Sequence, residues 1–308
     1  MKLAYSTCGW RRAPIDEVIK SLSEIGYHGV EISIQPHMLP PRAWSPKEAR
    51  RLRRLADDLG MLISNLHLGS ANLLSKTPYE PSLMSPYPNQ RDERIGLICR
   101  SLDFAAELGV DLVCFESGPL PPHLSPGAGM DYLIEGLSQC LDRAAQRRVR
   151  IGLEPAPEHL ISGYSAYVDL WNYFDGHPSL GLCLDVGHSY CFYEDIPAVI
   201  QDTPEIFHVH IKDISDRMQR HLVPGEGEID LAGALEALAG AEFEGFVSVE
   251  LMDAGGQPER AARKSVAALL EWLQQVRGHP DPVGPSRKPV RTISAESNGI
   301  DSSHPLGR

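Results

Sequence analysis

Short runs of apolar and β-branched residues alternate with longer amphipathic stretches along most of the chain. The segments between the runs repeat apolar residues with helical spacing, as in PIDEVIKSLSEIG and RIGLICRSLDFAAELG. Repeated strand–helix units favour a parallel sheet, because each crossover helix returns the chain to start another strand in the same direction. The eight expected strands are residues 3–7, 29–33, 62–68, 111–117, 150–155, 180–186, 206–212 and 246–251.

This count and spacing predict a single (β/α)8 barrel, the TIM barrel, over residues 1–277. Such a barrel typically needs about 250 residues. A doubly wound open sheet is the structural alternative. It usually has fewer strands, however, and the first expected strand is not followed by the G-x-G-x-x-G turn of dinucleotide-binding sheets. Gly26, Gly60 and Gly109 stand where three of the helices should end, as expected of the residue that best tolerates a left-handed conformation.

Two segments depart from this rhythm. Residues 69–90 form an expected long loop after the third strand, rich in Pro, Ser and Tyr. Loops of this length inside compact domains are usually functional lids or mobile segments. Residues 278–308 are rich in Pro, Ser and Gly and have almost no apolar pattern, so we predict a disordered tail outside the barrel.

Charge and composition exclude several classes of function. The 308 residues carry a formal net charge of -12, whereas a general nucleic-acid binder would present a basic surface. No stretch approaches the ~20 apolar residues that span a bilayer, and the N-terminus lacks a secretory signal. The six cysteines include no C-x-x-C pair and are expected to be buried in a reducing compartment. We therefore expect a cytoplasmic protein that binds neither nucleic acid nor membranes.

Ionisable side chains stand near the ends of seven successive expected strands. In a parallel barrel these carboxyl ends converge on one mouth, so the side chains should crowd together there. A single glutamate at a strand end is more often a loop cap or an ion-pair partner, but the joint pattern is harder to explain in that way. The residues are Glu31, His67, Glu116, Glu154, Asp185 with His188, His208 with His210, and Glu250.

Four of these residues, at four consecutive strand ends, predict a metal site: Glu154, Asp185, His210 and Glu250. A divalent cation offsets the repulsion among carboxylates held in one mouth. Three carboxylates and one imidazole suit Mn²⁺, Mg²⁺ or Co²⁺, with Zn²⁺ as an alternative. His208 lies two residues before His210 and so points to the same side of the strand; its role as a packed neighbour is favoured over that of a ligand.

Five motifs in order resemble the xylose-isomerase-like barrel superfamily, from about residue 1 to 277. That group includes sugar and sugar-phosphate isomerases, ketose 3-epimerases, hydroxypyruvate isomerases, inosose and 3-dehydroshikimate dehydratases, and apurinic endonucleases. The set is specific for the superfamily and much less so for any one reaction. The motifs are GLEP (152–155), LDVGH (184–188), HVHIKD (208–213), HLVPGEGEID (221–230) and VSVEL (247–251).

The resemblance implies roles for individual residues. It implies metal ligation by the same four residues, and proton transfer to and from the substrate by Glu154 and Glu250. His188 and Arg217 match positions that hold substrate oxygens, and His67 matches a histidine that binds metal or substrate in relatives. His221 matches a ligand of the multi-metal endonucleases. The expected substrate-binding residues are therefore His67, His188, Arg217 and His221.

The resemblance thus implies a divalent-metal-dependent isomerase or epimerase of a small sugar or sugar phosphate, working through an enediolate. A lyase of the inosose or 3-dehydroshikimate type remains open, because it also begins with proton abstraction beside a carbonyl. An apurinic endonuclease is disfavoured, since Glu116 stands near the place of a further histidine ligand. A non-catalytic binding barrel would not need the acid pair. Arg217 and Lys212 either hold an anionic group of the substrate or are surface cations of the strand-seven loop. The surface interpretation is favoured more for Lys212 than for Arg217. Many relatives form homo-oligomers.

Overall fold

The computed structural model describes residues 1–69, 72–218, 221–252 and 256–278. The tail expected to be disordered lies outside the described residues from 279 onward. The boundary between barrel and tail at residue 277 therefore stays a prediction.

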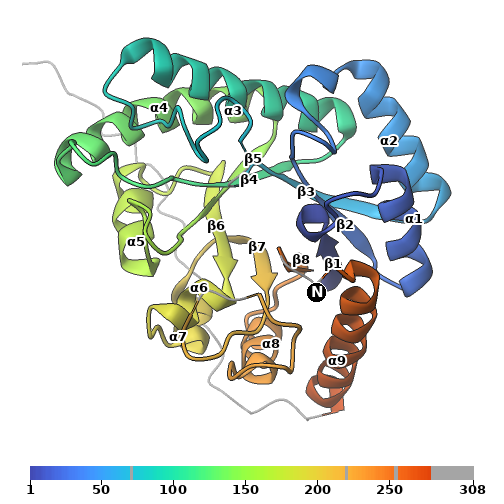
Figure 1. Cartoon of the computed structure of the whole chain (residues 1–308). Coiled ribbons are helices and arrows are strands. Elements are labelled where there is room, and N and C mark those ends of the chain that lie inside the picture. Colours follow the sequence, from blue (N-terminus) through green and yellow to red (C-terminus); the bar gives the residue numbers. More distant parts are fainter. Residues whose placement is uncertain (70–71, 219–220, 253–255, 279–308) are drawn as a thin grey trace, which may run out of the picture.

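Eight parallel strands close into a barrel in which each strand pairs with its neighbours in the sequence and β8 pairs with β1 (Figure 1). The predicted (β/α)8 barrel is confirmed, and all eight predicted strands are present. Their ends lie within two residues of the predicted ones. The strands are β1 (Lys2–Ser6), β2 (Gly29–Ser33), β3 (Leu62–His67), β4 (Leu112–Glu116), β5 (Arg150–Glu154), β6 (Leu180–Asp185), β7 (Ile206–Ile211) and β8 (Phe246–Val249).

The helices form a layer outside the ring of strands (Figure 1). Two short 3-10 turns, η1 (Thr7–Gly9) and η2 (Pro41–Ala43), follow β1 and β2. The α-helices in the described part of the chain are α1 (Ile15–Ile25), α2 (Pro46–Asp58), α3 (Pro88–Leu108), α4 (Pro126–Arg147), α5 (Tyr164–Tyr173), α6 (Val186–Cys191), α7 (Ile196–Asp202), α8 (Leu231–Gly240) and α9 (Pro258–Gly278).

Local sequence explains where several helices begin and end. Gly26 and Gly109 cap α1 and α3 in the left-handed conformation, with φ of 103° and 81°. Ser45 caps α2 by accepting a hydrogen bond from the amide of Glu48. Helix α3 begins at Pro88, inside the loop predicted over 69–90, because proline fits the first turn of a helix, where its missing N–H is not needed.

The last helix completes the outer layer beside the first one. Helix α9 packs against α1, and the hydroxyl of Tyr27 donates a hydrogen bond of 2.9 Å to the carbonyl of Ala262. Ala262 and Leu269 on α9 are fully buried. No helix among the described residues has the length and apolar character needed to cross a bilayer. The six cysteines are unpaired, and four of them are buried.

The described part of the loop after β3 is anchored to the barrel. The guanidinium of Arg94, a buried residue of α3, donates to the carbonyls of Tyr79 and Pro81 at 2.5 and 2.7 Å. Leu83 and Met84 are buried beneath it. The described residues of this loop are thus held in place by α3, and whether the loop acts as a functional lid stays a prediction.

Candidate metal centre and active site

The four predicted metal ligands meet at the mouth of the barrel. Glu154 and Asp185 end β5 and β6, His210 lies near the end of β7, and Glu250 directly follows β8. Each offers one ligand atom, and these four atoms all lie within 4.8 Å of one another. None of the four residues is more than 6% exposed. Three carboxylates and one imidazole at such spacing fit a divalent cation.

A carboxylate behind His210 fixes the orientation of its ring. Oε2 of Glu31, on β2, accepts from His210 Nε2 at 2.7 Å and lies 3.0 Å from His208 Nε2. Asn65 donates to the same oxygen at 3.0 Å. Because Nε2 of His210 carries the proton toward Glu31, Nδ1 faces Oε2 of Glu154, at 3.4 Å, and the rest of the cluster. Glu31 and His208 thus act behind a proposed ligand.

Lys212 lies inside the site, so its interpretation as a surface cation of the strand-seven loop is wrong. Its side chain is fully buried, and Nζ lies 2.6 Å from Asp185 Oδ2 and 2.8 Å from Glu250 Oε2. Burial acts to lower the pKa of Lys212, but Asp185 and Glu250 outweigh it and raise the pKa well above the ordinary value. One sequence signal pointed here: Lys212 continues the two-residue alternation of His208 and His210.

Opposite charges in the mouth stabilise one another in the metal-free protein. Burial acts to raise the pKa of Glu154, but His210 and His67 hold it well below the usual value. For Glu250, burial is outweighed mainly by Lys212, and the pKa falls to about 2. For His67, burial is outweighed by Glu154, and the pKa rises to about 10. A bound cation would take over this neutralisation and displace protons from the imidazoles.

Three of the four predicted substrate-binding residues surround this cluster. His67 Nε2 lies 2.9 Å from Glu154 Oε2. His188 Nδ1 lies 3.4 Å from Glu154 Oε1, and its backbone amide donates to Asp185. His221 Nδ1 lies 2.9 Å from the carbonyl of Glu250. The structure therefore brings these three histidines together with the carboxylates.

Arg217 lies apart from the cluster. Its guanidinium stacks on the rings of Tyr190 and Tyr193, with centroid distances of 4.0 and 3.9 Å, and donates to the carbonyl of Tyr190. Within the described ranges, no ion pair joins it to a carboxylate of the mouth. Its predicted contact with substrate oxygens stays a prediction.

Glu116 adds a further carboxylate at the end of β4. The hydroxyl of Tyr79, on the loop after β3, donates to Glu116 Oε1 at 3.3 Å. Burial raises the pKa of Glu116 to about 7, against the opposing effect of His67. A cavity of about 320 Å³ lies in front of this carboxylate, of His67 and of Glu250. Its size suits a small ligand. Tyr79, which contacts Glu116 from the loop after β3, was not singled out in the sequence.

Comparison with known proteins agrees with this architecture. The sequence model of the family described as xylose isomerase-like TIM barrel matches residues 19–275. The chain is 25% identical over 280 residues to fructoselysine 3-epimerase of Escherichia coli O157:H7, covering 89% of this chain and 99% of that protein. It is 30% identical over 283 residues to 3-dehydroshikimate dehydratase of Pseudomonas aeruginosa, covering 86% of this chain but only 41% of that protein.

Solved structures share the fold. A D-tagatose 3-epimerase-like protein superposes with a TM-score of 0.75 at 23% identity, covering 90% of this chain and 98% of that one. The IolI protein with a bound zinc atom gives a TM-score of 0.75 at 19% identity, covering 91% and 100% of the two chains. The matched sequence model spans most of the barrel. The chain therefore belongs to the xylose isomerase-like TIM barrel family.

Proposed function

We propose that this protein is a divalent-metal-dependent isomerase or epimerase of a small sugar or sugar phosphate. The observation that carries the proposal is the convergence of Glu154 and Glu250 with Asp185 and His210 within 4.8 Å. The relation to fructoselysine 3-epimerase, which extends over 99% of that protein, supports the reaction class.

The donor set fits a cation, and the residues that would hold it are Glu154, Asp185, His210 through Nδ1, and Glu250. A divalent cation at this point would act as a Lewis acid toward a carbonyl and the adjacent hydroxyl of the substrate, and would fix their orientation. Carboxylate-rich sites favour Mn²⁺, Mg²⁺ or Co²⁺, and Zn²⁺ also accepts this mixture of ligands.

The two glutamates act as the acid–base pair. Glu154 and Glu250 project from strands on different sides of the mouth, so one can take the proton from the carbon beside the carbonyl while the other returns a proton to it. Their low pKa values keep both ionised in the free protein, so one is available as the base, and the proton that the other returns to the carbon is first taken up from solvent. Lys212, in contact with Glu250, balances the charge that develops as the proton moves. His67 and His188 offer ring nitrogens to substrate hydroxyls.

A dehydratase is the second candidate, favoured by the 30% identity to 3-dehydroshikimate dehydratase. It would use the same first step, abstraction of a proton beside a carbonyl, and would then expel water. Mass spectrometry separates the two, because a dehydratase product is lighter by one water, whereas an isomerase or epimerase product keeps its mass and takes up solvent deuterium.

The test is a screen of ketoses, keto acids and sugar phosphates in heavy water, with the protein supplied in turn with each cation and its metal content measured. Glu154→Gln and Glu250→Gln should each lower proton exchange by at least about 10³-fold, because each removes a proton-transferring group. Glu236→Gln, an exposed change on α8, serves as the matched control. Full activity of either glutamine variant, or of the metal-free protein, would contradict the proposal.

A further inference from the structure

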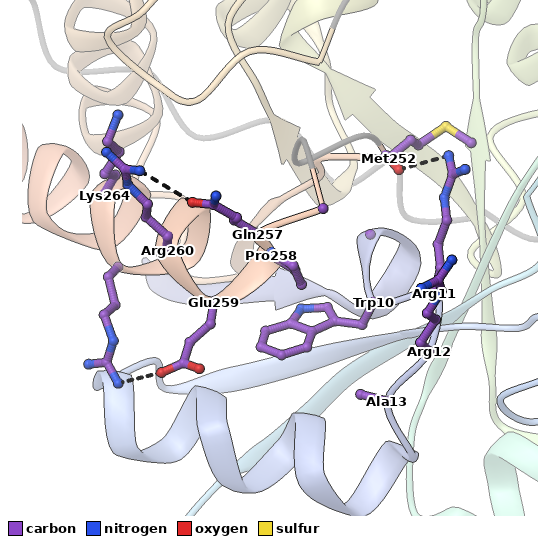
Figure 2. Close-up of a pocket in the computed structure, with 13 residues that line it drawn as sticks. Trp10, Arg11, Arg12, Ala13, Met252, Gln257, Pro258, Glu259, Arg260 and Lys264 are labelled. Atoms are coloured by element: carbon purple, nitrogen blue, oxygen red, sulfur yellow. Dashed lines mark hydrogen bonds and ion pairs between the residues drawn. The ribbon is translucent and has the colours of Figure 1, made fainter.

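A second, larger cavity opens beside the mouth, and we call it the basic groove. It lies between residues 9–13, at the end of η1 and just after it, and the first turns of α9 (Figure 2). Its volume is about 930 Å³, nearly three times the 320 Å³ of the mouth cavity. Neither the acid–base pair nor the proposed metal ligands line this groove.

Positive charge dominates the described lining of the groove, although the chain as a whole carries a net charge of -12. Arg263 is paired with Glu259 at 2.8 Å. Within the described part of the chain, Arg11, Arg12 and Arg260 have no carboxylate partner; Arg11 donates to a backbone carbonyl and Arg260 to an amide side chain. Three guanidinium groups around an open space are suited to binding oxyanions, because each presents a planar fork of donors.

The indole of Trp10 supplies an independent observation. Trp10 is only 7% exposed, and its side chain extends into the groove toward Pro258 (Figure 2). Its Nε1 is buried and has no hydrogen-bond acceptor among the described residues. A buried donor normally has a partner, and leaving one unpaired destabilises the folded state. The adjoining start of α9 also carries the partial positive charge of a helix N-terminus.

The groove borders the mouth cavity. Arg11 and Met252 line both cavities, and the mouth cavity is bounded farther in by His67 and Glu250. A substrate whose reacting carbon lies beside Glu250 can therefore extend past Arg11 without leaving the protein surface.

We propose that the basic groove binds the anionic end, a phosphate or a carboxylate, of a substrate whose carbonyl end lies in the mouth. This inference rests on the proposed function for the placement of the carbonyl end. The groove itself recognises oxyanions through Arg11, Arg12, Arg260 and the Nε1 of Trp10. The favoured substrates are thus sugar phosphates or sugar acids in preference to neutral sugars.

The first experiment measures anion binding without any turnover. Inorganic phosphate and acetate are titrated calorimetrically into the metal-free full chain, the Arg12→Gln/Arg260→Gln variant and the control Arg50→Gln/Arg54→Gln. Both pairs are exposed, and the control pair lies on α2. At least one anion should bind wild type and control alike and bind the groove variant at least about tenfold more weakly, as expected when two charge-assisted contacts are lost. Tight phosphate binding identifies a phosphoryl group, and acetate binding of equal strength identifies a carboxylate.

Equal affinity in all three proteins, or no binding of either anion, would overturn the proposal. A second readout compares kcat/KM for a ketose and its phosphate: the groove variant should lose at least about tenfold more on the charged substrate. If no substrate exchanges protons, the proposed function fails while the anion titration still reports on the groove. If exchange occurs but the charged and neutral substrates are affected equally, the groove assignment alone is wrong.

Discussion

The imidazole of His210 is held by Glu31, a carboxylate that the sequence placed at the mouth but to which it gave no role. Glu31 binds the ring nitrogen that faces away from Glu154, so it fixes both the tautomer and the angle of the proposed ligand. Carboxylates placed behind metal-bound histidines also make the imidazole a stronger ligand. The ring of His208, packed edge-on against His210, supports the same arrangement.

Replacing Glu31 with glutamine should therefore weaken metal binding without removing a ligand. We expect the dissociation constant for Mn²⁺ to rise about 10–100-fold, because the amide keeps a hydrogen bond but loses the negative charge. Competition with a chelating dye measures this constant, and Glu236→Gln on the surface of α8 is the control. Unchanged affinity would mean that Glu31 only packs against the ring.

In the metal-free protein, the ammonium group of Lys212 neutralises part of the negative charge of the carboxylates that a bound cation would otherwise neutralise. Its Nζ contacts one oxygen of Asp185 and one of Glu250, and both carboxylates are buried. Lys212→Met should lower the free energy of unfolding of the metal-free protein by about 3–5 kcal/mol, because two buried charges lose their partner. Urea unfolding in EDTA measures this loss.

Adding Mn²⁺ should restore more stability to Lys212→Met than to the wild type, since the cation compensates the same carboxylates. The exposed change Lys47→Met on α2 is the control and should respond to Mn²⁺ as the wild type does. A loss of the same size with and without Mn²⁺ would show that Lys212 does not share its carboxylates with the cation.

Glu116 should make stability depend on pH. Its pKa is about 7 in the folded protein and near 4.5 when unfolded, so the folded state binds more protons between these values. Stability from this group is complete below pH 4.5 and is lost as the pH rises through 7. In EDTA, from pH 5 to 8, the wild type should lose about 2 kcal/mol more than Glu116→Gln, after allowance for its partial exposure. Parallel profiles would contradict this expectation.

At the residue scale, the sequence predicted those groups whose place is set by a strand. Glu154, Asp185, His210 and Glu250 lie at or beside strand ends, and barrel closure alone brings them to one mouth. Arg217, by contrast, lies in the loop after β7, where Asp216 and Arg217 both have positive φ, at 56° and 49°. The direction of a side chain there depends on tertiary packing against Tyr190, which no periodicity encodes.

Among the elements, the ends of the strands were predicted to within two residues, because each strand is a short apolar run that can be recognised directly in the sequence. Helices α3 and α4 begin at Pro88 and Pro126, earlier than the apolar patterns RIGLICRSLDFAAELG and MDYLIEGLSQCLDRAAQ indicate. Their first turns carry few apolar residues, so a search for periodicity starts too late. The capping residue Ser125 before Pro126 was the available signal.

The loop after β3 depends on one buried side chain for its position. Arg94→Met would leave the carbonyls of Tyr79 and Pro81 without their donor, and we expect stability to fall by about 2–3 kcal/mol. Limited proteolysis should then cut residues 72–87 at least about tenfold faster, because local opening becomes that much more frequent. Arg100→Met, exposed on the same helix, is the control. Cleavage at an unchanged rate would mean that other contacts hold the loop.

For the whole molecule, the closure of the barrel determines which parts of the chain are needed for folding. Strand β8 pairs with β1, so no segment beyond the barrel is needed to complete the sheet. The outer layer, by contrast, is incomplete without α9. The buried apolar side chains of this helix include Ala261, Ala262, Val266 and Leu269. The composition of 278–308 offers little apolar surface to add to that core.

A chain ending at Gly278 should therefore unfold within about 1 °C of the full chain and show the same proton exchange, since the segment removed has few apolar residues to bury. A chain ending at Gln257 should fail to unfold cooperatively. Burial of each large apolar side chain contributes about 1.5–3 kcal/mol to stability. Removing α9 exposes α1 and the core beneath α9, so several such contributions are lost, whereas the net free energy of unfolding of a domain is only about 5–15 kcal/mol. Calorimetry of both truncations measures this directly. A large drop in Tm for the first truncation would place part of the folded domain beyond residue 278.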